Sequence, residues 1–452
     1  MKRETWGSKL GFIFAAAGSA VGLANIWRFP YVVGSSGGAV FVAVYLICLA
    51  LIGFPVFMAE VLIGRSTHLS PSGAFLRLGV KKFWGFCGKC VVLTGFIVSA
   101  FYSAIAAWIV GYLFEALSGR IISFENSNEA MEHFNSLVEN PIWCLSFHAV
   151  FIVFCSSILL FGVRKGIERG NTIFMPLLYL VLTVIVVYSL MQPNAWEGVR
   201  YLFSPDWNEI TPKIFLLALG QAFFTLSLGQ GTMVTYGSYL KHQDNLITSC
   251  MPVALMDTFV SLFSAVAVFA IVFSAGLEPD AGPSLIFSTL PLVFSKVPLG
   301  WLLATLFFLL VFFAAVTSEI SAMEPSIAYL IDNHGFKRKN ATAIVAAGAF
   351  VIGVPCALST NLLSNWKIFD LTIIQGLDFL TTGLLIPLGG FAAVVLVGWV
   401  WGIDKASKHL SEGAESLFFK CPWIRSYFKI CIKFVAPLLI LFVFLNAIGL
   451  FG

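Results

Sequence analysis

The sequence is poor in charged residues. Only 11% of its 452 residues are Asp, Glu, Lys or Arg, while 59% are hydrophobic. A typical soluble domain carries about 25% charged residues, so this chain has far less polar surface than a water-soluble fold needs. The scarcity of charge excludes an ordinary soluble protein and predicts a membrane protein.

Metal-binding and catalytic patterns are also lacking. The histidines are few and scattered, as His68, His148 and His242 illustrate. Cys87 and Cys90 have CxxC spacing, but no second pair or nearby histidine completes four zinc ligands. The sequence contains no phosphate-binding loop and no nucleophile elbow. We therefore expect no enzyme and no zinc centre.

What the chain does have is long apolar runs from one end to the other. Each is about 20 residues long, enough to cross a hydrocarbon core of roughly 30 Å as a helix, whereas barrel strands are shorter and alternate. We expect an all-α integral membrane protein with one membrane domain and eleven transmembrane helices. Their approximate centres are Val21, Leu51, Ile105, Phe151, Leu180, Phe224, Ser264, Leu310, Ala347, Leu385 and Leu439.

Positive charge is distributed unevenly among the loops. If the N-terminus is cytoplasmic, most Lys and Arg residues fall in inside loops, including the run 337–339. This is the positive-inside bias, so we expect a cytoplasmic N-terminus and, with eleven spans, a C-terminus outside. The net charge of +4 follows from this orientation, and we expect no nucleic-acid partner. The outside loops keep Arg120, Arg200, Lys213, Lys296 and Lys367.

Two apolar segments are interrupted near their middles by small and polar residues. Residues 18–25 read GSAVGLAN and residues 225–231 read TLSLGQG. The interruptions lie five spans apart, so the second helix enters the membrane from the opposite side, as an inverted repeat of five plus five helices requires. Paired discontinuous helices indicate a transporter's binding site. Taken singly, each glycine pair is also compatible with close helix packing.

An interruption at bilayer depth leaves peptide groups without helical partners, which is tolerated only where they line a cavity or bind something. Free carbonyls suit Na⁺ and free amides suit a carboxylate, and the ends of the half-helices add dipoles of the matching sign. An amino acid zwitterion accompanied by Na⁺ satisfies both needs.

Several polar residues inside the apolar segments are candidates for a transport pathway. Arg28 follows the first interruption and could pair with Asp378 across a vestibule; the alternatives are a snorkelling arginine and a solvated loop acid. Asp257 lies too deep for such an explanation. Residues 317–318 are hydroxyl residues followed by Glu319, and these hydroxyls could instead bond their own helix.

At these residues the chain resembles the neurotransmitter:sodium symporter family, in particular its bacterial amino acid transporters, over nearly its whole length. The resemblance implies a leucine-transporter-like fold, with an inverted repeat at about 10–191 and 212–402 and one further helix at about 426–450 instead of the family's usual two. The matching motifs are Asn25-Ile-Trp-Arg-Phe-Pro30, Gly37-Gly38, Glu60, Gly64-Arg65, Phe223-Phe-Thr-Leu-Ser-Leu-Gly229, Thr317-Ser318 and Gly402-Ile-Asp-Lys-Ala406.

The resemblance also implies two sodium sites and a substrate site between the interrupted helices. The first sodium site would comprise the Ala20 carbonyl, Asn25, Thr225, Asp257 and the substrate carboxylate. The second would comprise the carbonyls of Gly18, Val21 and Ala314 and the hydroxyls of Thr317 and Ser318. The substrate would contact Ala20, Gly22, Val98, Tyr102, Phe224, Thr225, Ser227, Gln230, Ser318 and Ala322, its carboxylate meeting Gly22 and Tyr102.

Two gates follow from the same resemblance, one on each side of the substrate. Arg28 with Asp378, beside the Phe224 lid, would close the outside. The inside would be closed by Arg3 with Asp332, near Trp6, Ser238 and Tyr239. Opening one gate while the other holds gives alternating access.

The chain departs from the family at several of these positions. Asp257 replaces an asparagine common in the family, beside the residues that match the chloride site of chloride-dependent members, namely Tyr45, Gln221, Thr225 and Ser261. Its fixed negative charge disfavours an anion there. We therefore expect chloride-independent transport, with proton return on Asp257 left open.

Other departures change the pocket. Gln230 and Ala322 make it more polar and wider than a leucine site, and Ala24 adds a methyl group where glycine is usual. Glu319 adds an acid beside the second sodium site, where a proton role is left open. Gly22 matches the position at which amine carriers place an aspartate, which favours a substrate that brings its own carboxylate.

We predict Na⁺-coupled uptake of a neutral L-amino acid, hydrophobic or moderately polar, across the bacterial cytoplasmic membrane. One alternative is a Na⁺-coupled carrier of an amine or osmolyte. Another is an uncoupled sensor or channel-like protein, although a channel would need a continuous polar stripe. The preferred amino acid, the ion stoichiometry and the oligomeric state do not follow from the sequence.

Overall fold

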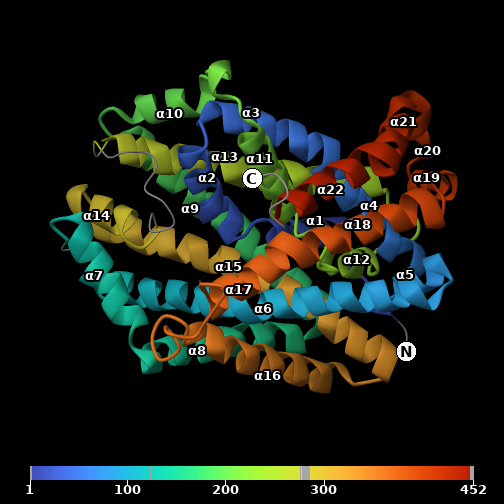
Figure 1. The fold of residues 1–452 in the computed structure, drawn as a ribbon, viewed down its shortest axis with the longest axis horizontal. Coiled ribbons are helices and arrows are strands. Elements are labelled where there is room, and N and C mark those ends of the chain that lie inside the picture. Colours follow the sequence, from blue (N-terminus) through green and yellow to red (C-terminus); the bar gives the residue numbers. More distant parts are fainter. Residues whose placement is uncertain (1–2, 123, 275, 277–285, 448–452) are drawn as a thin grey trace.

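The computed structural model is a bundle of long helices (Figure 1). It describes residues 3–122, 124–274, 276 and 286–447. Across these ranges, nine helices are long and apolar enough to cross a membrane, and a bent pair, Lys9–Ala20 with Ala24–Ser35, makes up to ten. The apolar helix Pro212–Thr225 lies at the remaining predicted centre. Because its 14 residues fall short of a bilayer crossing, the count of eleven spans stays a prediction.

The first half of the chain contains the helices up to Leu190, several of which are interrupted by π-helical turns. In order they are α1 (Lys9–Ala20), η1 (Ala24–Arg28), α2 (Phe29–Ser35), α3 (Ala39–Cys48), η2 (Leu49–Gly53), α4 (Phe54–Thr67), α5 (Pro71–Gly79), α6 (Lys82–Leu117), η3 (Arg120–Ile122), α7 (Ser127–Val138), α8 (Pro141–Leu160), η4 (Val163–Glu168) and α9 (Arg169–Leu190).

The second half contains the remaining helices and one short hairpin. They are α10 (Ala195–Phe203), η5 (Trp207–Glu209), α11 (Pro212–Thr225), α12 (Thr232–Gly237), α13 (Leu246–Ser274), α14 (Thr289–Lys296), α15 (Gly300–His334), α16 (Arg338–Ala357), β1 (Lys367–Ile368), β2 (Leu371–Thr372), α17 (Ile373–Asp378), η7 (Phe379–Leu385), α18 (Ile386–Val395), η8 (Leu396–Val400), α19 (Ile403–Ser411), α20 (Glu415–Lys420), α21 (Trp423–Ile430), η9 (Cys431–Val435) and α22 (Ala436–Ala447).

The last span runs from Trp423 to Ala447 and so begins slightly before the predicted helix. Residues 448–450 of that prediction lie outside the described residues. The two strands pair antiparallel as a short hairpin before α17.

Both predicted helix interruptions are present. The first is narrower than predicted, because α1 continues through Ala20 and the chain bends by 52° before Ala24. The second separates α11 from α12, leaving residues 226–231 outside any helix. Gly229 and Gly231 have φ of 74° and 83° there, a left-handed conformation that glycine adopts without strain and that explains their position.

The two interrupted helices lie inside the bundle. α1 packs against α9, α13 and α15, and α12 packs against α4 and α15; the labels of these helices cluster near the middle of Figure 1. The contact between α4 and α12 is backbone on backbone, because a Cβ at Gly64 would lie 1.9 Å from the Val234 carbonyl oxygen. A Cβ at Gly237 would likewise lie 2.3 Å from the Val61 carbonyl oxygen. Glycine at both positions therefore permits this packing.

Candidate functional site

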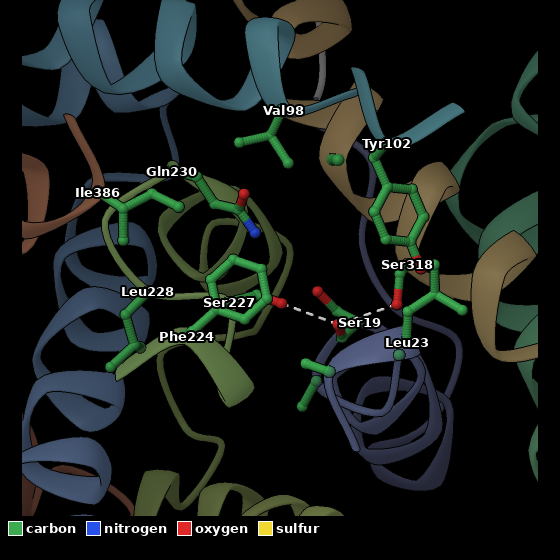
Figure 2. A pocket seen from close by; sticks show the side chains of 14 residues that line it. Ser19, Leu23, Val98, Tyr102, Phe224, Ser227, Leu228, Gln230, Ser318 and Ile386 are labelled. Atoms are coloured by element: carbon green, nitrogen blue, oxygen red, sulfur yellow. Dashed lines mark hydrogen bonds between the residues drawn. The ribbon is translucent and has the colours of Figure 1, made fainter. Parts of the chain in front are cut away.

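The two interruptions face each other across a cavity of about 50 Å³ (Figure 2). α6, α15 and α18 complete its wall. Its lining comprises Ser19, Ala20, Gly22, Leu23, Ala24, Val98, Tyr102, Phe224, Ser227, Leu228, Gln230, Ser318, Ala322 and Ile386.

All of the predicted substrate-contacting residues except Thr225 line this cavity. Thr225 faces a polar cluster beside it instead, as described below. Five lining residues are not among the predicted substrate contacts: Ser19, Leu23, Ala24, Leu228 and Ile386. The first four lie in the predicted interruptions and could have been found there, whereas Ile386 belongs to an unremarkable apolar run.

The hydroxyl groups of Tyr102 and Ser318 lie on one side of the cavity. The buried hydroxyl of Tyr102 lies beside Ser318 and the backbone of Leu23. Ser318 Oγ lies 3.4 Å from the Ser19 carbonyl oxygen, and Ser227 Oγ donates to that same oxygen at 2.8 Å. Figure 2 shows Tyr102 and Ser318 together, with Gln230 on the opposite side.

A second cluster of oxygen atoms lies beside the first interruption, where α11 meets α13. Asn25 Nδ2 donates to Thr225 Oγ1 at 3.0 Å and to Asp257 Oδ1 at 2.7 Å. It also reaches Ser261 Oγ at 2.8 Å, and Thr225 Oγ1 donates to Asp257 at 2.9 Å. All four side chains are fully buried. The structure thus brings together the three side chains predicted for the first sodium site.

The Gly22 amide, which the resemblance assigns to the substrate carboxylate, is engaged in this structure. It donates to Asn25 Oδ1 at 2.9 Å. The Gly22 amide and the Asn25 side chain are therefore hydrogen-bonded to each other across the bend. The resemblance assigns Gly22 to the substrate carboxylate and Asn25 to the first sodium ion.

The residues predicted for the second sodium site also converge. Ser318 Oγ lies 3.5 Å from the Gly18 carbonyl oxygen and 3.4 Å from that of Val21. Thr317 Oγ1 donates to the Ala314 carbonyl oxygen at 3.2 Å. The contacts place α1 and α15 side by side at the end of α1. Hydroxyl and carbonyl oxygens are ligands that a hard cation such as Na⁺ accepts.

Two further buried acids flank the site. Glu60 accepts a hydrogen bond from the Gly229 amide at 2.7 Å and so satisfies one peptide group of the second interruption. Glu319 accepts one from Ser99 Oγ at 2.5 Å, and its other carboxylate oxygen has no partner among the described residues. Glu319 is not among the residues that line the cavity.

Arg28 and Asp378 line a second cavity, of about 250 Å³, on the α2 side of the site. Over the described ranges no ion pair joins the two residues. The Arg28 guanidinium instead lies 5.1 Å from the centre of the Phe224 ring. Phe224 lines both cavities, as do Leu23, Ala24 and Tyr102. Arg28 and Asp378, the predicted outer gate, therefore line the same cavity but form no ion pair across it.

The predicted inner gate, at the end of the bundle opposite the Arg28 cavity, is closed by hydrogen bonds and an ion pair. Arg3 forms an ion pair with Asp332 and donates to Ser238 Oγ at 2.6 Å. The Trp6 amide donates to the Tyr239 carbonyl oxygen at 3.1 Å, and its indole to the Tyr236 carbonyl oxygen at 3.0 Å. These contacts join the segment before α1 to α12 and α15.

Sequence reasoning missed the charges that surround this inner closure. Glu324, fully buried, pairs with Arg338 at 2.6 Å and accepts from the Tyr239 hydroxyl at 2.6 Å. Arg338 also pairs with Glu4 at 3.3 Å, and Glu168 accepts from the Gly7 amide at 2.7 Å. No motif marks these residues, because their partners lie up to 334 positions apart.

Comparison with known proteins gives a consistent result. The profile of the "Sodium:neurotransmitter symporter family" matches residues 3–137 and 124–451. An uncharacterized sodium-dependent transporter of Bacillus subtilis (strain 168) is 35% identical over 451 residues, 99% of this chain and 98% of the relative. One from Haemophilus influenzae (strain ATCC 51907 / DSM 11121 / KW20 / Rd) is 33% identical over 98% of both chains.

Among solved structures, the crystal structure of MhsT in complex with L-phenylalanine superposes with a TM-score of 0.89. Its sequence is 38% identical, and the match covers 99% of this chain and 100% of that one.

Proposed function

The chain belongs to the sodium:neurotransmitter symporter family, and from this premise we propose that it takes up a neutral L-amino acid, hydrophobic or moderately polar, together with Na⁺. It is a sodium-dependent membrane transporter and not an enzyme. The observation that carries the substrate proposal is the cavity between two interrupted helices, with the Tyr102 hydroxyl and the Asp257 cluster beside it. The complex of the related MhsT with L-phenylalanine supports it.

Two sodium sites are the first part of this proposal. The Asn25, Thr225 and Asp257 cluster with the Ala20 carbonyl would hold one ion. The oxygens of Gly18, Val21, Ala314, Thr317 and Ser318 would hold the other. Their chemistry fits, because every proposed ligand is an oxygen atom and the first site adds a carboxylate to balance the charge of the cation.

The bond between Gly22 and Asn25 offers a physical basis for coupling. An ion at the first site would draw Asn25 Oδ1 away from the Gly22 amide, which would then be free for the substrate carboxylate. A carboxylate on Gly22 would equally free Asn25 Oδ1 for the ion. Each ligand thereby removes a competitor of the other, which makes their binding mutually favourable.

Transport without chloride is the second part of the proposal. Asp257 supplies a fixed negative charge within 2.7–3.0 Å of Asn25 and Thr225, where an anion would be repelled. When Na⁺ and substrate have left, a buried carboxylate without a cation is costly. We propose that a proton on Asp257 accompanies the empty carrier on its return.

Alternating access is the third part. The Arg3–Asp332 closure on one side and the unbridged Arg28–Asp378 cavity on the other correspond to a carrier that receives substrate from outside. Substrate would then draw Phe224 and Arg28 inward and close the outer cavity. The proposed setting is the bacterial cytoplasmic membrane, with the N-terminus in the cytoplasm, the C-terminus outside, and five-helix repeats at about 10–191 and 212–402.

Thermal stabilisation of the purified protein tests the proposal. Each of the common amino acids is added in Na⁺ buffer and in matched K⁺ buffer, because a ligand that binds only the native state raises its stability by mass action, by about 2.7 kcal/mol at 100 times the Kd. We expect at least one neutral amino acid to raise the melting temperature in Na⁺ and not in K⁺. If no amino acid does so, the protein is better explained as a carrier of an amine or osmolyte.

A further inference from the structure

Gln230 brings an unsatisfied amide into the apolar side of the cavity. Its side chain is 7% exposed, and Oε1 has no hydrogen-bond partner in the described part of the chain. The neighbouring lining residues Val98, Ala322 and Ile386 are apolar. In Figure 2 its amide points into the cavity from the side opposite Tyr102.

Gln230 differs from the other polar lining residues in its apolar surroundings. The Ser19 hydroxyl also lacks a partner among the described residues, but Ser19 lies beside Ser318. The Ser227 hydroxyl, by contrast, is satisfied by the Ser19 carbonyl oxygen. A buried amide offers a donor and an acceptor whichever way its ends are assigned. Burying it against an apolar ligand leaves both unpaired, which is worth about tenfold or more in affinity against a ligand that pairs them.

We propose that Gln230 selects amino acids whose uncharged side chain carries a hydroxyl or carboxamide group, such as threonine, serine, asparagine and glutamine, over apolar amino acids of the same shape. The inference rests on the proposed function, because it assumes that the substrate main chain is held near Tyr102 and directs the side chain towards Gln230. The inference narrows the proposed substrates from hydrophobic or moderately polar amino acids to polar, uncharged ones.

Charge and size narrow the class further. The described residues that line the cavity include no ionised side chain, so a charged substrate side chain would be desolvated without a partner. The cavity of about 50 Å³ has room for only a few water molecules, at about 10–15 Å³ each by the same measure. Short side chains therefore fit it better than aromatic ones.

The test compares near-isosteric pairs in the unaltered protein. Binding of threonine against valine, and of asparagine against leucine, is measured by calorimetry in Na⁺ and in K⁺. We expect the polar member of each pair to bind about tenfold or more tightly in Na⁺. Equal or tighter binding of valine and leucine overturns the inference while leaving amino acid transport intact. If no amino acid binds in Na⁺, the proposed function fails and the inference fails with it.

A substitution locates the effect. Gln230→Met keeps the length of the side chain and removes both polar ends, so threonine and asparagine should lose about tenfold while valine and leucine hold or gain. Ser227→Ala is the matched control, because it removes a hydroxyl of the same lining that is already satisfied. It should weaken both members of a pair by the same factor. A Gln230→Met protein that keeps the polar preference of the unaltered protein contradicts the assignment.

Discussion

Ser227 in the second interrupted helix donates a hydrogen bond of 2.8 Å to the carbonyl oxygen of Ser19 in the first. The two interruptions therefore satisfy part of each other's polar backbone, and the cavity wall is continuous between residues 208 positions apart. A substrate bound in this cavity would contact both halves of the chain at once, and its binding would then depend on their relative position.

Replacing Asp257 by Asn should make transport respond to chloride. The substitution removes the fixed negative charge, while Tyr45, Gln221 and Ser261 remain to hold an anion. We expect uptake into proteoliposomes by Asp257→Asn to rise severalfold when chloride replaces gluconate, and uptake by the unaltered protein to stay constant.

Glu319→Gln is the control for this experiment. It removes an equally buried acid that bonds Ser99 instead of the Asp257 cluster, so it should create no chloride dependence. Severalfold stimulation of the unaltered protein by chloride would show that the anion site is functional beside Asp257.

Replacing Arg3 by Ala should loosen the inner closure. Asp332 loses its ion pair with Arg3 and keeps the hydrogen bond from the Ser70 amide at 2.7 Å. A charged hydrogen bond is worth about 1.5–3 kcal/mol, so the closed inner side should become roughly tenfold or more less favoured. Hydrogen exchange of residues 3–20 should accelerate accordingly. Lys9→Ala, which removes a charge that bonds only Thr248 nearby, should leave this exchange unchanged; equal protection in both variants would refute the role of Arg3.

Glu324→Gln should destabilise the folded protein strongly. Glu324 is fully buried and pairs with Arg338 at 2.6 Å, and removing one partner of a buried pair costs about 3–5 kcal/mol. The melting temperature in detergent should fall by several degrees. Glu4→Gln removes the other partner of the same arginine, a side chain 42% exposed, and should cost less than about 1 kcal/mol. Equal losses of stability in Glu324→Gln and Glu4→Gln would mean that burial does not determine how much each ion pair with Arg338 contributes.

Acidification should loosen α7, which lies outside the membrane spans. Burial lowers the pKa of His133; the Glu115 carboxylate opposes this shift and Arg120 adds to it. The unfolded segment therefore binds a proton more readily than the folded one, so the stability of α7 is full above the ordinary histidine pKa of about 6.5 and falls as the pH drops below it. Protection factors of α7 amides should decline below this pH. His133→Gln should abolish the decline, and a decline that persists would assign it to another group.

The sequence indicated the interruptions because glycine and polar residues are rare inside apolar runs, and Gly229 and Gly231 do adopt positive φ. It could not show that the first bend is confined to the residues after Ala20, since helix propensity does not distinguish Gly18 from Gly22. The inner network of Glu4, Glu324 and Arg338 was equally hidden. Pairing across hundreds of residues is set by helix packing, which no local pattern records.

The outer pair illustrates the same limit in another way. The residues Arg28 and Asp378 were matched from resemblance, and the structure places both in one cavity without an ion pair. A motif identifies the participants of a gate, but whether they touch depends on the conformational state of the bundle.

The contact of Gly64 and Gly237 has a consequence for movement. The backbones of α4 and α12 touch directly there, and a six-residue helix such as α12 has little stability of its own. We expect α4 and α12 to move together as one rigid unit. If the inner side opens, the non-helical stretch 226–231 and the bend after Ala20 are natural pivots, and both border the cavity. The hinges of the chain would then coincide with the proposed substrate site.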